Sequence, residues 1–385
     1  MRFRADDGSE FPDWEEKKLG DIATIVMGQS PDSKNYSEDP IGEVLVQGNA
    51  DLKNGKVSPR IWTTESPKSA EPGSLLMTVR APVGALAITD IPVALGRGVC
   101  AITGPEILYY QLAQVENNHY WDRVSAGSTF TAIDSNSIRA LKLCCPSESE
   151  QKKITSLLSS VDETLLLCQR KLDLLTQAKK ALIYNLFPRK GESEPRIRLA
   201  GFSGAWALEH VGSFLQESFE KGHTGEKARR LTVKLWGKGI EPKNSPFTGS
   251  SNTQYYVRHA GQLMYGKLDF LHAAFGIVPS ELDGWESTLD SPAFDVKDAN
   301  PYFLLYIFLQ PEFYLHHGQI ANGSRKAKRI HPALFFQMPI RIPSRDEQDA
   351  IVELLSSADA LVDQARVELE QWREVKKSLL QQLFV

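Results

Sequence analysis

The stretch PSESEQKKITSLLSS at residues 146–160 returns as PSRDEQDAIVELLSS at residues 343–357. Extended to Phe187 and Phe384, the two stretches align without a gap and share about 16 of 42 positions. Self-similarity at a fixed period indicates a structural repeat. Both stretches combine a Pro-Ser start with a long, charged and leucine-rich run, which is typical of an amphipathic helix.

The beginnings of the two halves agree as well, because Trp14 precedes Leu19-Gly20 at the spacing that separates Trp206 from Val211-Gly212. The sequence therefore predicts a pseudo-two-fold internal repeat in which a domain and a helix alternate twice. We expect an α+β fold with these parts: a first domain at residues 1–145, a helix at 146–187, a linker at 188–202, a second domain at 203–342 and a second helix at 343–385.

Each predicted helix carries residues at alternating steps of four and three that form an unbroken heptad seam. One lysine interrupts each seam at the same register, Lys179 in the first and Lys376 in the second. A period of 3.5 residues sustained over several heptads favours helix-on-helix pairing over packing of each helix on its own domain. The residues predicted to form this interface are Ile154, Leu158, Val161, Leu165, Leu172, Ile351, Leu355, Val362, Leu369 and Trp372.

An antiparallel pair needs no long return path, because the second domain begins soon after the first helix ends. We therefore expect two mixed α/β domains separated by two long antiparallel helices that form a coiled-coil spacer. Within the domains, glycine and proline punctuate short β-rich runs such as residues 75–80 and 260–265, and helices are expected near 107–117 and 302–316.

The composition is that of a soluble protein, with 42% hydrophobic and 24% charged residues and no apolar run long enough to span a bilayer. The four cysteines form no CxxC pair, which fits a reducing cytoplasm. We expect a cytoplasmic protein without a membrane partner. A net charge of −4 gives no bulk attraction to nucleic acid, so any DNA affinity must come from local patches.

Several motifs follow one another along the first half of the chain: Trp14 with Leu19-Gly20, Gly73-Ser-Leu-Leu-Met77, Gly84-Ala-Leu-Ala-Ile88, Gly127-Ser-Thr and the Pro-Ser-x2-Glu-Gln-x2-Ile-x2-Leu-Leu stretch. In this order they resemble the specificity subunit of type I restriction–modification enzymes. The second half carries matching pieces at Phe275-Gly-Ile-Val-Pro279, Gly323-Ser324 and Pro343-Ser344. The resemblance covers nearly the whole chain, and the repeated start of the long helices is its most specific part.

The resemblance implies a non-catalytic subunit that reads a bipartite site on double-stranded DNA, with one target-recognition domain for each half-site. It implies that the helix pair sets the gap between the half-sites and docks two methyltransferase (M) subunits, and that restriction and motor (R) subunits join for cleavage. S-adenosylmethionine, ATP and Mg would then belong to those partners, and this chain would bind no cofactor and no metal.

Arg and Lys bind guanine edges and phosphates, and Asn and Gln bind adenine, which makes such residues in glycine-rich loops candidates for DNA contacts. The candidates are Gln47, Asn49, Arg80 and Arg97 in the first domain, and Lys267, Arg325, Lys326, Lys328 and Arg329 in the second.

Two other function classes remain open: a stand-alone methyltransferase or nuclease, and a protein–protein adaptor. Gly96-x-Gly98-x-x-Ala101 fits a nucleotide-binding letter pattern but is not followed by a predicted helix, so a phosphate cradle is not expected. Asn300-Pro301-Tyr302-Phe303 resembles an adenine-methyltransferase tetrapeptide but lacks its second proline, and a helix cap explains it better. S-adenosylmethionine binding would favour the enzyme, and absence of salt-dependent DNA binding would favour the adaptor.

Overall fold

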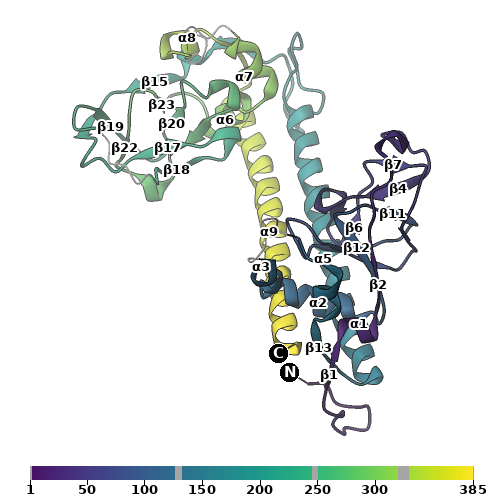
Figure 1. The fold of residues 1–385 in the computed structure, drawn as a ribbon. Helices are drawn as coiled ribbons and strands as arrows, with labels where there is room; N and C mark the ends of the chain where they lie inside the picture. Colours follow the sequence, from purple (N-terminus) through teal and green to yellow (C-terminus); the bar gives the residue numbers. More distant parts are fainter. Residues whose placement is uncertain (1, 126–131, 245–249, 320–328, 385) are drawn as a thin grey trace. The chain divides into compact units, whose positions relative to one another are not determined.

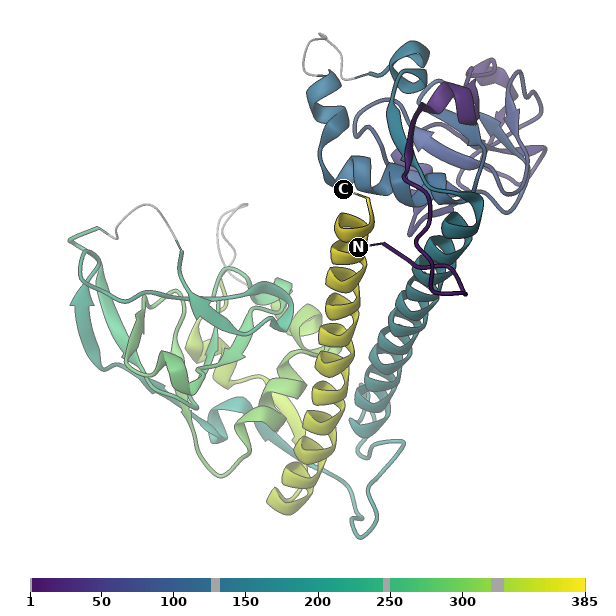
Figure 2. The same cartoon turned by 90° about the horizontal axis from the view of Figure 1, so that it is seen from below.

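The computed structural model describes residues 2–125, 132–244, 250–319 and 329–384. The chain divides into two compact units: residues 1–170 with 367–385 form unit 1, and residues 171–366 form unit 2. Two continuous helices of 39 residues, α5 (Glu148–Leu186) and α9 (Arg345–Leu383), occupy the repeated stretches (Figure 2). The division runs through both of them, so each unit contains one domain, part of α5 and part of α9.

Unit 1 holds the mixed α/β first domain (Figure 1). Its strands are β1 (Glu15–Lys18), β2 (Thr24–Met27), β3 (Tyr36–Ser37), β4 (Glu43–Val46), β5 (Leu52–Lys53), β6 (Lys56–Val57), β7 (Trp62–Thr63), β8 (Ser69–Ala70), β9 (Leu75–Thr78), β10 (Leu86–Ile88), β11 (Val93–Leu95), β12 (Val99–Thr103) and β13 (Lys142–Cys145). Its shorter helices are α1 (Leu19–Ile22), α2 (Ile107–Asn117), α3 (Tyr120–Ser125) and α4 (Ser135–Arg139).

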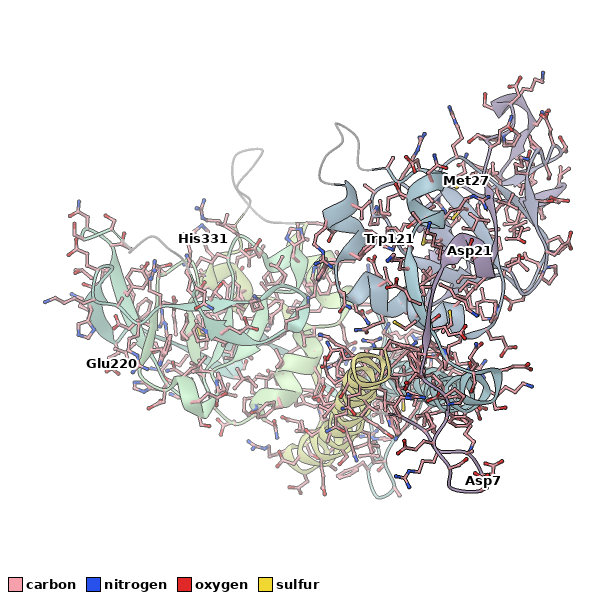
Figure 3. The ribbon with its side chains drawn as sticks, turned by 60° about the horizontal axis from the view of Figure 1, so that its bottom comes forward. Asp7, Asp21, Met27, Trp121, Glu220 and His331 are labelled. Atoms are coloured by element: carbon pink, nitrogen blue, oxygen red, sulfur yellow. The ribbon has the colours of Figure 1, made fainter. Side chains whose placement is uncertain are left out.

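A six-stranded sheet of order β2-β12-β9-β10-β6-β5 forms the centre of the first domain. Alternate residues of its strands face opposite sides: Leu75 and Met77 of β9 pack with the helices, whereas Leu76 packs with the five-stranded sheet β3-β7-β4-β11-β8. Trp121 of α3 is buried in the helix-facing cluster (Figure 3). Because both faces are covered, the central strands read as continuous apolar runs and not as alternating ones.

Unit 2 holds the second domain, also mixed α/β. Its strands are β14 (Ala207–His210), β15 (Leu215–Ser218), β16 (Lys221–Thr224), β17 (Leu231–Val233), β18 (Ile240–Pro242), β19 (Gln254–Arg258), β20 (Leu263–Tyr265), β21 (Phe275–Ile277), β22 (Trp285–Ser287), β23 (Ala293–Val296) and β24 (Pro339–Ile342). Its shorter helices are α6 (Pro301–Phe308), α7 (Pro311–Gly318) and α8 (Pro332–Phe336).

The core of the second domain is aromatic. Tilted and edge-to-face rings surround Phe335, which contacts Tyr265, Phe270 and Phe308 with ring centroids 4.8–6.0 Å apart. These rings lie between the sheet β15-β23-β20-β21 and the helices α6, α7 and α8, and they continue to Ile351 and Leu355 of α9. The domain and its part of the helix pair therefore share one core.

The start of each long helix is tied to its domain in the same way in both units. Strand β13 pairs antiparallel with β1, and β24 pairs antiparallel with β14. At the helix starts, the Gln151 amide donates to the carbonyl of Pro146 at 2.8 Å, and the Gln348 amide donates to that of Pro343 at 3.0 Å. The aligned Pro-Ser-x2-Glu-Gln letters thus make matching contacts.

The two helices predicted within the domains are present, but one of them is broken at a proline. The helix expected near 107–117 is α2, and Asn300 caps α6 as predicted, accepting from the backbone N–H of Tyr302 at 2.9 Å. The prediction of a single helix over 302–316 is wrong, because this stretch forms two helices, α6 and α7. Pro311 begins the second helix and has no N–H to continue the first.

None of the described helices is long and apolar enough to cross a membrane.

Candidate nucleic-acid interface

A turn at Gly96–Gly98 joins three strand ends in the first domain. Strands β4 and β11 run parallel, so their carboxyl ends lie at one edge of the sheet, where the N–H of Gly96 donates to the carbonyl of Val46 at 2.8 Å. The end of β9 reaches the same turn, since the N–H of Val79 donates to the carbonyl of Gly98 at 2.8 Å. Residues that follow these strands are therefore brought together.

All four DNA-contact candidates of the first domain lie around this turn. Gln47 and Asn49 follow β4, Arg80 follows β9, and Arg97 occupies the turn itself; the four side chains are exposed. The backbone N–H of Arg97 donates to the Ser30 hydroxyl at 3.1 Å, which fixes the turn without using the guanidinium. Two amides and two guanidinium groups at one edge can bind base edges and phosphates of a duplex.

A buried aspartate, not identified from the sequence, shapes this edge. Asp51 is 2% exposed, and its carboxylate accepts from the backbone N–H of Gln47 at 2.8 Å and of Gly48 at 3.2 Å. The guanidinium of Arg60 donates to the other carboxylate oxygen at 2.8 Å. Asp51 thus holds the loop that presents Gln47 and Asn49, and its negative charge is compensated by Arg60.

The glycines of the turn allow backbone segments to approach closely. A Cβ on Gly98 would lie 2.0 Å from the carbonyl oxygen of Gln47, and one on Gly96 would lie 3.1 Å from the Gln47 Cα. The two glycines of the Gly96-x-Gly98 motif therefore allow the turn to pass close to the backbone at Gln47. Val99, which follows the motif, begins strand β12 and not a helix.

Gly98→Ala is expected to lower the free energy of unfolding by about 1–3 kcal/mol, the usual cost of overpacking a close contact. The matched control is Gly48→Ala on the facing loop after β4, where a Cβ would meet nothing within 4 Å and the backbone is extended. Urea unfolding of both variants measures the difference. Equal midpoints for the two would contradict the close approach at Gly98.

In the second domain, Lys267 and Arg329 both contact Asp290. The backbone N–H of Lys267 donates to the carbonyl of Asp290 at 2.9 Å, and the Arg329 guanidinium lies 3.4 Å from the Asp290 carboxylate. Lys267 is 8% exposed and burial lowers its pKa, whereas Arg329 is half-buried. The other candidates of this domain, Arg325, Lys326 and Lys328, lie outside the described residues.

A second basic segment, residues 221–243, was missed in the sequence reasoning. It spans strands β16 to β18, and its exposed cations include Lys227, Arg229 and Lys238. The segment carries seven Lys or Arg residues and two Glu residues, so the charge density itself was the available signal. The exposed ring of Trp236 lies within it, at a backbone φ of 61° that non-glycine residues seldom adopt.

The predicted helix-interface residues differ in burial. Seven are buried and three are partly exposed; the buried ones are Ile154, Leu158, Val161, Ile351, Leu355, Val362 and Leu369, and the others are Leu165, Leu172 and Trp372. In unit 1, residues near the start of α5 cluster with Leu380 and Leu383 near the end of α9. In unit 2, the end of α5 contributes Leu186 to a cluster that includes Leu355 near the start of α9.

Near the start of each long helix, a buried glutamate accepts hydrogen bonds from an arginine and a tryptophan. Both oxygens of Glu150 accept from the Arg2 guanidinium at 3.0 Å, and Oε2 also accepts from Trp14 Nε1 at 2.9 Å.

The same set recurs in unit 2. Glu347 accepts from Arg198 at 2.9 and 2.8 Å and from Trp206 Nε1 at 3.3 Å. The repeated Glu-Gln letters therefore join each domain to its long helix through charge-assisted hydrogen bonds.

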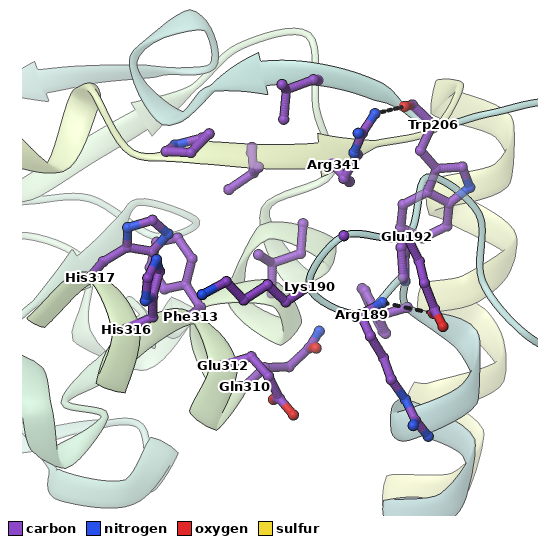
Figure 4. A pocket seen from close by; sticks show the side chains of 17 residues that line it. Arg189, Lys190, Glu192, Trp206, Gln310, Glu312, Phe313, His316, His317 and Arg341 are labelled. Carbon is purple, nitrogen blue, oxygen red and sulfur yellow. Dashed lines mark hydrogen bonds between the residues drawn. The ribbon is translucent and has the colours of Figure 1, made fainter.

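A cavity of about 300 Å³ lies at the junction of the second domain with the end of α5 (Figure 4). Its lining combines apolar side chains, among them Phe187, Trp206 and Phe313, with charged and polar ones, and Lys190 points toward the two histidines His316 and His317. Burial lowers the pKa of His317, with a smaller effect from the neighbouring His316. Neither Lys267 nor Arg329 lines this cavity, so it is separate from the candidate DNA contacts.

No group of three His, Cys, Asp or Glu side chains among the described residues is arranged to hold a metal ion.

Comparison with known proteins gives one family. Residues 12–177 match the family model described as the type I restriction modification DNA specificity domain. Two relatives from Methanocaldococcus jannaschii, the type I restriction enzyme MjaX and MjaIX specificity subunits, are 28% identical over 197 residues and 27% identical over 200 residues. The matches cover 49% and 48% of this chain, and this chain spans about half, 46%, of the length of each relative.

Two solved structures share the fold over nearly the whole chain. The S subunit of the type I restriction-modification system from M. genitalium has a TM-score of 0.61 at 14% identity, covering 100% of this chain and 99% of its own. A chain from a structure on complex assembly and conformational transition of the type I R-M system has a TM-score of 0.59 at 16% identity, covering 97% and 98%. At sequence identities of 14% and 16%, these comparisons show a shared fold alone.

Proposed function

We propose that this chain, whose residues 12–177 match the family model described as the type I restriction modification DNA specificity domain, reads a bipartite site on double-stranded DNA. Each domain contacts one half-site, and the helices α5 and α9 form a coiled-coil spacer between them. The observation that carries the proposal is the gathering of Gln47, Asn49, Arg80 and Arg97 at one edge of the first domain. The second domain contributes Arg329 and the basic segment 221–243, together with Arg325, Lys326 and Lys328.

The charge distribution supports local DNA contacts. The net charge of the chain is −4, so phosphate binding must rely on clustered cations and not on the overall field. The exposed amides and guanidinium groups of the first domain have the chemistry to distinguish adenine from guanine in the major groove. Asp51 and the glycine turn hold these groups on a rigid edge, which limits the entropy lost on binding.

In this proposal the chain is a non-catalytic subunit of a larger complex. The paired helices carry two methyltransferase subunits, and restriction subunits join them. These partners supply the sites for S-adenosylmethionine, ATP and Mg. The relatives' names and the solved structure on assembly of the type I R-M system support such partners in general.

The direct test is co-expression of the chain with its methyltransferase, followed by mapping of methylated adenines on host DNA. We expect one bipartite motif that appears only when this chain is present. A complex that forms but methylates no defined sequence would favour a protein–protein adaptor. Binding of S-adenosylmethionine by the purified chain alone would favour a stand-alone methyltransferase.

Modular reading makes a further prediction. Exchange of residues 203–342 for the second domain of another family member should change one half of the methylated motif and leave the other half unaltered. This exchange takes both β14 and β24, so the strand pair at the helix start stays matched. Exchange of residues 1–145 is the reciprocal control and should change the opposite half. A change in both halves after either exchange would contradict one domain per half-site.

A further inference from the structure

Each long helix carries a lysine in its apolar seam that is paired with an aspartate of the other long helix. In unit 1, Nζ of Lys376 on α9 lies 2.5 Å from Oδ1 of Asp162 on α5. In unit 2, Lys179 on α5 pairs with Asp359 on α9. The four side chains are between 19% and 39% exposed, so solvent screens these pairs less than it screens pairs on an open helix surface.

A tyrosine from the domain completes each pair. The hydroxyl of Tyr110 on α2 donates to Oδ2 of Asp162 at 3.1 Å, and the hydroxyl of Tyr306 on α6 donates to Oδ2 of Asp359 at 2.7 Å. Burial raises the pKa of both tyrosines, as does the neighbouring carboxylate, so the hydroxyls stay protonated donors. Each aspartate therefore joins three elements: its own helix, the opposite helix and the domain.

These two sets, Tyr110–Asp162–Lys376 and Tyr306–Asp359–Lys179, differ in kind from the apolar contacts around them. Leucine contacts are non-directional and tolerate small rotations and slides between helices. A hydrogen bond or ion pair weakens steeply when its angle or distance changes, and a buried polar residue in a helix seam is a known means of specifying register. One carboxylate with two directional partners thus favours a single placement of the domain on its helices.

We propose that Tyr110, Asp162 and Lys376, and equally Tyr306, Asp359 and Lys179, are positioning residues that hold each domain at one angle on its helix pair and so restrict the spacing of half-sites that the complex accepts. The inference rests on the proposed function, because spacing has a meaning only for a bipartite target. These six residues are proposed to determine how strictly the complex selects the spacing between half-sites. They are not proposed to affect which bases each domain reads.

The test uses the double variant Tyr110→Phe with Tyr306→Phe, which removes two hydroxyl groups and keeps both rings and both ion pairs. The matched control is Tyr109→Phe with Tyr302→Phe, tyrosines of the same two helices that are not hydrogen-bonded to Asp162 or Asp359. Each protein is assembled with its methyltransferase. Methylation rates are measured on duplexes whose half-sites are separated by the native spacer, by one base pair fewer and by one more.

Wild type and control should methylate only the native spacer efficiently. The Tyr110→Phe, Tyr306→Phe variant should keep its rate on the native spacer within about twofold, while the rate on altered spacers relative to the native one rises about tenfold. Tenfold corresponds to about 1.4 kcal/mol, comparable to a hydrogen bond to a charged group. A loss of stability alone would lower all three rates together and leave their ratios unchanged.

Unchanged ratios in the variant, or the same change in the control, would overturn the inference. Failure of wild type to methylate any spacer selectively would count against the proposed function. In that case, amide hydrogen exchange of α2 and α6 in the purified chain decides the inference separately. Faster exchange in the variant than in the control is expected if the hydroxyls hold the domains, and equal exchange would reject it.

Discussion

Leu158→Asp is expected to unfold unit 1 and Leu355→Asp to unfold unit 2, each at a free-energy cost of about 3–5 kcal/mol, the scale of an uncompensated buried charge. Both leucines are fully buried. Leu158 packs in a cluster with Leu380 and Leu383, and Leu355 packs into the aromatic core of the second domain. A carboxylate at either site would lack both water and a cationic partner.

Exposed leucines of the same helices provide the controls for this prediction. Leu174 on α5 is 66% exposed and Leu361 on α9 is 51% exposed, so Leu174→Asp and Leu361→Asp should change the free energy of unfolding by less than about 0.5 kcal/mol. Denaturant unfolding followed by circular dichroism and by tryptophan fluorescence measures all four variants. Midpoints for Leu158→Asp and Leu355→Asp equal to those of the controls would show that the seam does not stabilise either unit.

Glu347→Ala should destabilise the chain by about 3–5 kcal/mol, because it removes one partner from a buried ion pair. The substitution removes the carboxylate that accepts from the Arg198 guanidinium, 16% exposed, and from the Trp206 indole N–H, while Arg198 keeps the carbonyls of Ser203 and Gly204 as acceptors. Glu150→Ala should cost less, since Arg2 is 43% exposed and water can replace part of the lost interaction. The order of the two effects follows from the exposure of the arginines alone.

Two further variants separate charge from hydrogen bonding at this position. Glu347→Gln keeps an acceptor for the indole N–H but loses the charge opposite Arg198, so an intermediate loss is expected. Glu353→Ala, an exposed glutamate on the same helix, is the control. Thermal unfolding of the series gives the ranking. A loss in Glu347→Ala no larger than in Glu353→Ala would contradict a structural role for the buried carboxylate.

The long helices could be predicted from sequence because their information is local and repeated. Their heptad pattern and their Pro-Ser-x2-Glu-Gln starts each lie within one stretch of chain. It was harder to predict which single residues are buried near the ends of these helices. The heptad rule places Leu379 in the seam, whereas the structure buries Leu380 more fully, since contacts with the domain also decide which side of α9 is covered.

Contacts between distant residues could not be predicted in this way. Tyr110 and Asp162 are 52 positions apart, and nothing in the spacing of either residue indicates the other. The interruption of each seam by a lysine was visible in the sequence, but its aspartate and tyrosine partners required the fold. Asp51 was equally hidden, because a buried aspartate that accepts from backbone N–H groups looks in sequence like a solvated charge.

The DNA-contact candidates differ in where the structure places them. Gln47, Asn49, Arg80 and Arg97 were chosen for their chemistry, and the parallel pairing of β4 with β11 brings their strand ends to one edge. Lys267 has the same chemistry but is only 8% exposed, and its backbone N–H donates to the carbonyl of Asp290. The segment 221–243 was not predicted, because the densest run of cations in the second domain lies at residues 324–329. The excess of Lys and Arg over Glu in 221–243 could nevertheless be seen in the sequence.

The composition of the two units has a consequence for biosynthesis. Unit 2 is one continuous stretch of chain, residues 171–366, and all of its contacts are available once that stretch has left the ribosome. Unit 1 also includes 19 residues, Val367–Val385, that follow unit 2 in the chain. Ile154 and Leu158 are synthesised before unit 2, and Leu380 and Leu383 cannot cover them until translation has passed unit 2. The first domain to be made is therefore the second to be completed, and a ribosome that stalls before residue 367 releases a chain with one finished unit and one open apolar helix face.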